Sequence, residues 1–185
     1  MVTIRENQRG RAIAAIGAHL LARGLAETSL RQLAAAAGVS DRMLLYYFTD
    51  KADILAQAMA QIAGESGAQL AKAIPADASL TAGQLIGEAV RVTSTPAMKP
   101  FMRLWIEVVA AAARGEAPFP AIAQQITAGF LSWIEARLGG TPPNERAAAA
   151  AMILAVVDGM ALVEICSGAA LTANAADYAA RLRID

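Results

Sequence analysis

Apolar residues recur along the chain at the three- and four-residue spacing that is typical of α-helices. Ile13, Ile16 and Leu20 lie on one face of a helix that we expect over residues 4–22. No segment alternates apolar and polar residues for long enough to predict a β-sheet. The pattern therefore predicts an all-α protein, and the abundant alanine favours closely packed helices.

Start and stop signals divide the N-terminal part into short helices. Gly24 is placed to end the first helix. Ser29 and Gln32 form a capping-box pattern at the start of a second helix, which Gly38 ends. Ser40 is the candidate N-cap of a third helix. The helices predicted after the first one span residues 30–37, 41–48 and 51–73.

The segment 74–77, which contains Pro75, is the first clear break in this pattern. Beyond it the helical spacing returns, interrupted by separators that are rich in proline and glycine. The helices predicted in this part span residues 80–93, 98–114, 121–138, 144–167 and 173–182.

Two short helices and a tight turn over residues 37–40 have the layout of a helix-turn-helix. In that motif one helix crosses the DNA backbone and the next lies in the major groove. Tyr46 and Tyr47 are adjacent, so they cannot both point into the small core behind the motif. The residues expected to form that core are Leu30, Leu33, Val39, Leu44 and Phe48.

The charge distribution agrees with contact between the N-terminal part and phosphate. The whole chain has 16 basic and 16 acidic residues and no net charge. Residues 1–51 contain seven basic and four acidic residues, a net charge of +3, so the remainder carries −3. A basic segment of this kind attracts the DNA backbone.

Gly24 and the segments 28–34, 37–40 and 44–51 resemble, in order and spacing, the N-terminal motif of the tetracycline-repressor (TetR) family. The resemblance implies a helix-turn-helix DNA-binding domain over residues 1–50. It implies a C-terminal helical bundle over residues 51–185 for effector binding and dimerisation. The implied function is that of a sequence-specific transcriptional regulator, a repressor that a small, largely apolar effector releases from its operator. Activation stays open.

The resemblance also implies which residues contact the DNA backbone. Thr28 and Ser29, at the start of the second helix, would offer a hydroxyl and amides to phosphate. Tyr46 and Tyr47 occupy aromatic positions that touch the backbone or a thymine methyl group. Lys51, at the head of the fourth helix, matches a lysine that meets phosphate.

The first turn of the recognition helix carries the residues that the resemblance places against base edges, namely Ser40, Arg42 and Met43. The family often has a small residue where Arg42 stands and usually has tyrosine where Leu45 stands. Arg42 can pair with guanine O6 and N7, or it can grip a phosphate, and the sequence leaves both open.

A methionine and aromatic stripe lies along the helix predicted over residues 98–114. Such a stripe is plain core in many proteins, but the resemblance implies that the central helices enclose an effector pocket, so both interpretations stand. Arg103 and Glu107 are polar anchors for the effector or a solvated pair on the outer face. The residues expected to line the pocket are Met98, Phe101, Met102, Trp105 and Val109.

The last two long helices have the composition of an interface. Residues 157–162 resemble the dimerisation helix of the family, which implies a homodimer. Two recognition helices roughly 34–36 Å apart would then read successive major grooves of a palindromic operator in double-stranded DNA. The residues expected at the interface are Gly129, Phe130, Trp133, Met152, Val156 and Met160.

No motif of catalysis, phosphate binding or metal ligation follows residue 75, so we expect no catalytic residue, no cofactor and no metal. His19 is expected to be structural, and Cys166, the single cysteine, to be buried. One cysteine and an N-terminus without the apolar stretch of a signal peptide predict a cytoplasmic protein. The longest apolar run, residues 147–157, is too short for a membrane span.

Two other functions stay open at this point. One is a helical carrier or enzyme that binds an apolar small molecule in the C-terminal bundle, against which the missing catalytic motif counts. The other is an interaction protein that uses its helices only for association. Sequence-specific DNA binding distinguishes a regulator from both.

Overall fold

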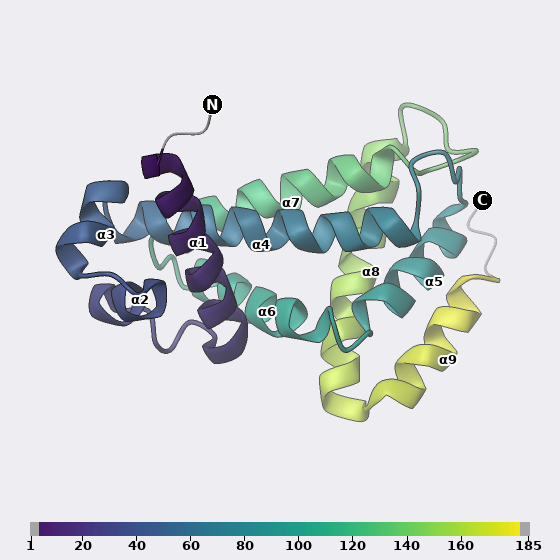
Figure 1. The fold of residues 1–185 in the computed structure, drawn as a ribbon. Helices are drawn as coiled ribbons and strands as arrows, with labels where there is room; N and C mark the ends of the chain where they lie inside the picture. Colours follow the sequence, from purple (N-terminus) through teal and green to yellow (C-terminus); the bar gives the residue numbers. More distant parts are fainter. Residues whose placement is uncertain (1–3, 182–185) are drawn as a thin grey trace. The chain divides into compact units, whose positions relative to one another are not determined.

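A computed structural model describes residues 4–181 of the chain, and every regular element within that range is an α-helix (Figure 1). The all-α fold predicted from the sequence is confirmed. The helices are α1 (Ile4–Arg23), α2 (Leu30–Ala37), α3 (Asp41–Tyr47), α4 (Lys51–Ala73), α5 (Ala82–Thr93), α6 (Lys99–Ala113), α7 (Phe119–Glu135), α8 (Arg146–Ser167) and α9 (Ala169–Ala179).

The predicted boundaries are closest to the observed ones where cap signals are strong. The predicted spans of α2 and α4 agree with the observed ones, whereas α9 begins at Ala169, four residues earlier than predicted. Gly168 alone separates α8 from α9, so no proline or loop-rich segment marks that boundary. Leu182, the predicted end of the last helix, lies outside the described residues.

The chain forms two compact units. Unit 1 contains Met1–Glu65 and Arg103–Ile126, and unit 2 contains Ser66–Met102 and Thr127–Asp185. Both units therefore draw on segments that are distant in the sequence. The predicted boundary at residue 50 between a DNA-binding and an effector-binding domain does not coincide with the boundaries of these two units. It stays a prediction about function.

In unit 1, the caps that the sequence predicts hold α2 and α3. Ser29 Oγ accepts the N–H of Gln32 at 3.3 Å, and the Ser29 N–H donates to Gln32 Oε1 at 3.0 Å. Gly38 ends α2 with a left-handed backbone, φ +69°, which a residue with a side chain adopts only at a cost. Ser40 then caps α3 by accepting the Met43 N–H at 3.2 Å.

A small apolar core joins these helices to α1, which lies beside both of them (Figure 1). Leu33, Leu44 and Phe48 are buried, as predicted, whereas Leu30 and Val39 are half-buried. Truncating a buried leucine costs about 2–5 kcal/mol, against about 1 kcal/mol for losing one cap. The core therefore supplies most of the stability of the motif, and the caps fix where each helix begins and ends.

Unit 2 has its own core, in which α5 packs against α8 and α9. Leu85 and Ile153 are fully buried at its centre. Two backbone hydrogen bonds join the segment before α5 to the segment after α7: the Leu80 N–H donates to the Arg137 carbonyl at 2.9 Å, and the Leu80 carbonyl accepts the Gly139 N–H at 2.8 Å. The Arg137 guanidinium is buried and donates to the Ile74 carbonyl at 2.7 Å.

Helix α8 differs from the others because it is apolar around most of its circumference. Its mean hydropathy reaches 2.1, and among the described residues it alone has the length and composition of a membrane span. The uninterrupted apolar run that we predicted to be too short covers only residues 147–157, whereas the length and composition of a span belong to the whole helix Arg146–Ser167. Ala150, Ile153 and Val157 enter the core of unit 2, while much of the remaining apolar surface of the helix is exposed.

Candidate nucleic-acid interface

The first turn of α3 presents its side chains outward. Arg42 is exposed, and Met43 is 43% exposed. Ser40 is exposed too, although its hydroxyl already accepts the Met43 N–H. The three residues predicted to face base edges therefore share one accessible surface. N-terminal residues of a recognition helix are those that reach base edges in the major groove.

The aromatic residues at the end of α3 divide between surface and core. Tyr46 is 60% exposed, Tyr47 is half-buried and Phe48 is buried. The rings of Tyr46 and Tyr47 meet edge to face, with centroids 5.6 Å apart. Of these three aromatic side chains, Tyr46 is therefore the most accessible to DNA, and Tyr47 packs against its ring.

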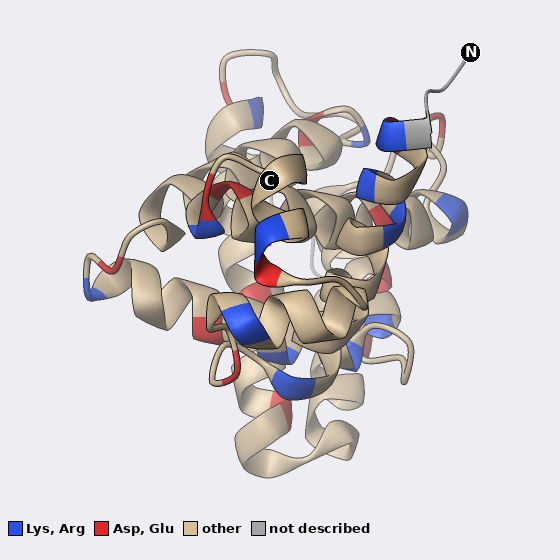
Figure 2. Cartoon of the chain, turned by 60° about the vertical axis from the view of Figure 1, so that its left-hand side comes forward, with Lys and Arg blue, Asp and Glu red and all other residues tan. Residues whose placement is uncertain are grey.

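Two arginines of α1 join this surface, although no local sequence pattern predicts it. The Arg5 Nη2 donates to the Tyr46 carbonyl at 3.1 Å, and its guanidinium lies 4.7 Å from the Tyr46 ring centre. Arg9 lies 5.1 Å from the Phe48 ring centre. Figure 2 shows lysine and arginine positions recurring along the helix that follows the N-terminal label. Only the net charge of residues 1–51 pointed to them.

The head of α4 carries Lys51, which is exposed, as a phosphate contact requires. Asp50 caps the helix, since its Oδ1 accepts the Asp53 N–H at 2.8 Å, and Asp53 Oδ2 accepts the Thr49 N–H at 3.0 Å. Burial tends to raise the pKa of Asp53, but hydrogen bonds from Gln57 and Thr49, with the charge of Arg9, hold it below its ordinary value. The turn before Lys51 is therefore fixed by hydrogen bonds to the side chains of Asp50 and Asp53.

Thr28 is placed differently from the prediction. It is only 9% exposed, and its hydroxyl donates to the Leu25 carbonyl at 3.0 Å. The hydroxyl therefore closes the turn between α1 and α2 and is not free to meet phosphate. Ser29 is exposed, but its hydroxyl serves the capping box. Any phosphate contact at this helix start falls to backbone amides rather than to the threonine hydroxyl.

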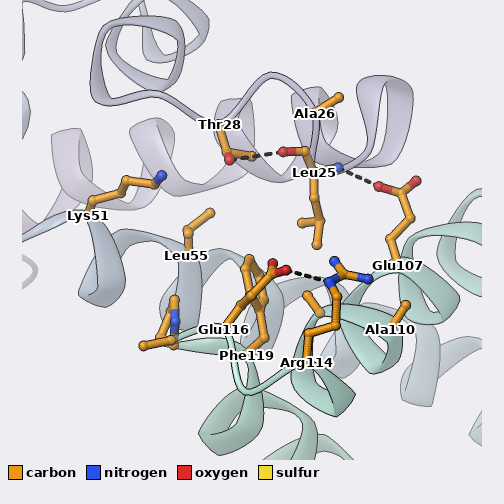
Figure 3. Close-up of a pocket in the computed structure, with 13 residues that line it drawn as sticks. Leu25, Ala26, Thr28, Lys51, Leu55, Glu107, Ala110, Arg114, Glu116 and Phe119 are labelled. Carbon is orange, nitrogen blue, oxygen red and sulfur yellow. Dashed lines mark hydrogen bonds and ion pairs between the residues drawn. The ribbon is translucent and has the colours of Figure 1, made fainter.

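A carboxylate on α6 holds the same turn from the other side. Glu107 Oε2 accepts the Leu25 N–H at 2.7 Å (Figure 3). Gly24 beside it has φ +67°, and a Cβ added there would clash with the Glu107 carboxylate. The pairing of Arg103 with Glu107 that we weighed is wrong, because Glu107 binds this backbone amide instead. Only long-range packing brings the two segments together, so no sequence signal predicts it.

The residues predicted to line an effector pocket do not all face inward. Met98, Phe101, Met102 and Trp105 are buried, whereas Val109 is 43% exposed. In the second half of α6 the buried face follows the helical repeat through Leu104, Trp105, Val108 and Ala111, and Val109 lies outside it. Val109 is therefore a surface residue. The other four residues remain candidates for a pocket lining.

The residues predicted at a dimer interface are accessible in the single chain. Met152 is 40% exposed, and the set as a whole ranges from half-buried to exposed; its other members are Gly129, Phe130, Trp133, Val156 and Met160. Cys166 is exposed, so the expectation of a buried thiol was wrong. His19 has the structural role predicted, because its Nε2 donates to the Glu27 carbonyl at 2.9 Å.

These features together define a DNA-binding protein of the helix-turn-helix class. Residues 13–58 match the family model described as bacterial regulatory proteins of the tetR family. Within the described residues, no cluster of three or more histidine, cysteine, aspartate or glutamate side chains is arranged to hold a metal ion.

Solved structures share the fold over nearly the whole chain. A protein from Rhodococcus sp. described as a TetR-family transcriptional regulator aligns with a TM-score of 0.74 at 20% identity, covering 94% of each chain. A TetR-family member from Streptomyces coelicolor A3 aligns with a TM-score of 0.66 at 25% identity, covering 93% of this chain and 97% of that one. The multidrug-binding protein EbrR, complexed with proflavin, aligns with a TM-score of 0.67 at 25% identity, covering 94% and 95%. Among curated proteins, no sequence matches.

The N-terminal part of the chain therefore resembles the tetR family of bacterial regulatory proteins, and the whole chain has the fold of solved structures described as TetR-family regulators. The apolar helix α8 contributes Ala150, Ile153 and Val157 to the core of unit 2, so it is a helix of the folded protein and not a signal segment.

The contact between Gly24 and Glu107 yields a test by a double-mutant cycle. Gly24→Ala forces the carboxylate away from Leu25 and places alanine in a left-handed backbone, so it should lower the free energy of unfolding by about 1–3 kcal/mol. Glu107→Ala removes the carboxylate that accepts the Leu25 N–H, and with it the group that a Cβ at Gly24 would clash with. The double variant should therefore lose less stability than the sum of the single losses, as measured by urea unfolding.

Gly64→Ala is the matched control, because nothing lies within 4 Å of a Cβ at this helical position. It should raise stability by about 0.5–1 kcal/mol, the ordinary gain for alanine over glycine inside a helix. If the losses of Gly24→Ala and Glu107→Ala add to within about 0.3 kcal/mol, the two residues do not interact as described.

Proposed function

We propose that the protein is a repressor that binds a palindromic operator as a homodimer and leaves it when a small, largely apolar effector binds. The observation that carries the proposal is the exposed first turn of α3, with Arg42 and Met43 accessible beside the arginines of α1. The cytoplasm is the compartment that this function requires, because the operator lies there.

Within this proposal Arg42 reads a base and Lys51 neutralises a phosphate. Arg42 stands in the first turn of the recognition helix, where side chains approach base edges, and its two-pronged guanidinium suits guanine O6 and N7. Lys51 stands at the head of α4, outside the recognition helix, and its ammonium is a point charge. The two residues should therefore affect sequence preference and salt dependence differently.

Replacing each residue by alanine separates the two roles. With operator duplexes selected from a random pool by the purified protein, Arg42→Ala should cost about 1–3 kcal/mol of discrimination at one base pair per half-site. Lys51→Ala should weaken binding to all duplexes alike and reduce the slope of log K against log salt by about one per protomer. Fluorescence anisotropy over a salt series measures both.

Each variant serves as the control for the other. Uniform weakening by Arg42→Ala, with a reduced salt slope, would assign Arg42 to phosphate. If neither variant changes binding to any duplex, α3 and the head of α4 are not part of the interface with DNA.

A dimer formed through α8 accounts for the apolar surface that this helix leaves exposed. Met152, Leu162 and Ile165 are large apolar side chains that are 40%, 49% and 60% exposed along it. A stable interface buries about 800 Å² per partner and has an apolar centre, which a long apolar helix supplies. Palindromic operators are read by proteins with the same two-fold symmetry.

Met152→Arg should convert the dimer into a monomer, because a charge at the centre of an apolar interface is left unpaired. Val109→Arg is the matched control, since Val109 on α6 is 43% exposed but lies outside the predicted interface. Sedimentation velocity should show a monomer for Met152→Arg and a dimer for Val109→Arg. Two dimers, or a wild-type monomer at micromolar concentration, would contradict the proposed interface.

The effector site that we propose lies along α6, where Met98, Phe101, Met102 and Trp105 supply apolar surface. The similar protein EbrR is described as binding multiple drugs, and its complex contains proflavin, a planar aromatic compound. Effector binding would favour a dimer whose recognition helices no longer match successive major grooves. By linkage, operator and effector would then weaken each other's binding by the same factor.

A further inference from the structure

Unit 1 contains a cavity of about 540 Å³, and none of the residues that line it belongs to the effector site proposed along α6. Its walls come from the turn between α1 and α2, the first two turns of α4, the end of α6 and the segment leading into α7 (Figure 3). All of these segments belong to unit 1. The volume lies within the range of pockets that hold drug-sized molecules.

Part of the cavity wall is apolar. Leu25, Leu55 and Phe119 line it, and Ala110 and Ala111 of α6 keep the space open because their side chains are small. A flat aromatic or branched aliphatic body would bury apolar surface against these residues, which favours binding by about 25 cal/mol for each Å² removed from water.

The polar groups of the wall are paired with one exception. Glu107 accepts the Leu25 N–H, and Glu116 accepts the Arg114 guanidinium, so both carboxylates have partners. The Thr28 hydroxyl donates to the Leu25 carbonyl. Lys51 lines the same cavity, and none of the carboxylates in the described part of the chain pairs with its ammonium. The lining therefore carries two cations and two carboxylates, and Lys51 is the only one of the four charged side chains without a hydrogen-bonded or ion-paired partner among the described residues.

We propose that this cavity binds a small amphipathic anion, an aromatic carboxylate or sulfonate, whose charged group pairs with Lys51 and whose body packs against Leu25, Leu55 and Phe119. The Lys51 ammonium donates charge-assisted hydrogen bonds to the anion. A neutral compound of the same shape lacks this contact, and a cation is repelled by Lys51. The charge of the ligand thus distinguishes this cavity from the largely apolar site proposed along α6.

Occupancy of the cavity bears on DNA binding, and this step rests on the proposed function. Lys51 cannot neutralise an operator phosphate and the bound anion at the same time. The turn between α1 and α2, which the cavity borders, also begins the helix-turn-helix. The anion and the operator therefore compete, and each lowers the affinity of the protein for the other.

Anilinonaphthalene sulfonate is a suitable probe, and uncharged N-phenylnaphthylamine is its counterpart without the sulfonate. Titrated into the full-length protein without DNA and followed by fluorescence, the sulfonate should bind about tenfold more tightly than the neutral compound, as one charge-assisted contact predicts. Lys51→Gln should remove that preference. Lys72→Gln, which removes the same charge from an exposed lysine outside the cavity, should leave the preference unchanged. Equal binding of both probes to the wild type would overturn the proposal.

A second pair of variants tests the location. Ala110→Phe fills the cavity from α6 and should weaken sulfonate binding by about tenfold or more, whereas Ala113→Phe, also exposed on α6 but outside the cavity, should not. Circular dichroism confirms that each variant is folded. Undiminished binding to folded Ala110→Phe would place the probe elsewhere and overturn the proposal.

The competition with DNA is measured separately, by adding the sulfonate to the complex of protein and operator. Release of the operator at probe concentrations that saturate the free protein supports the link, and failure to release it overturns the link while leaving the binding site established. A protein that binds the sulfonate through Lys51 but binds no operator would contradict the proposed function and not the cavity. A protein that binds the operator but not the sulfonate would contradict the cavity proposal and leave the proposed function intact.

Discussion

The surface that meets DNA depends on holding two helices that are too short to persist alone. Helices α2 and α3 have eight and seven residues, well below the length at which an isolated helix is stable in water. Buried Leu33, Leu44 and Phe48 hold them against α1. The caps at Ser29, Gly38 and Ser40 satisfy the backbone groups at their ends. Because packing and capping use the inner face, the first turn of α3 is left free to face outward.

The same constraint extends beyond the motif itself. The turn that leads into α2 is fixed by Thr28 from within and by Glu107 from α6, so a helix distant in the sequence sets where the motif begins. On the other side, Asp50 and Asp53 fix the turn before Lys51. The cavity lies between these two fixed turns, which is why a ligand there would act on the DNA-binding surface without touching the recognition helix.

Features that depend on neighbouring residues were predicted well from the sequence, and features that depend on distant contacts were not. The capping box of Ser29 and Gln32, the left-handed Gly38 and the exposure of at least one of the two adjacent tyrosines follow from local chemistry and helical spacing. The bond from Glu107 to Leu25 joins residues 82 positions apart, and nothing in either segment indicates the other. Val109 and Cys166 were misplaced because an apolar side chain was assumed to be buried, whereas α6 and α8 have more apolar residues than their buried faces hold.

The central claim is that the exposed turn of α3 reads DNA sequence. The most direct measurement is the affinity of the purified protein for DNA flanking its own gene, compared with scrambled DNA of the same composition across a salt series. The account predicts a preference of about a thousandfold or more for a two-fold symmetric site, retained at physiological salt. Equal, weak binding to both DNAs that disappears steeply as salt rises would reflect the basic surface alone, and would contradict the claim if no other operator could be selected from random duplexes.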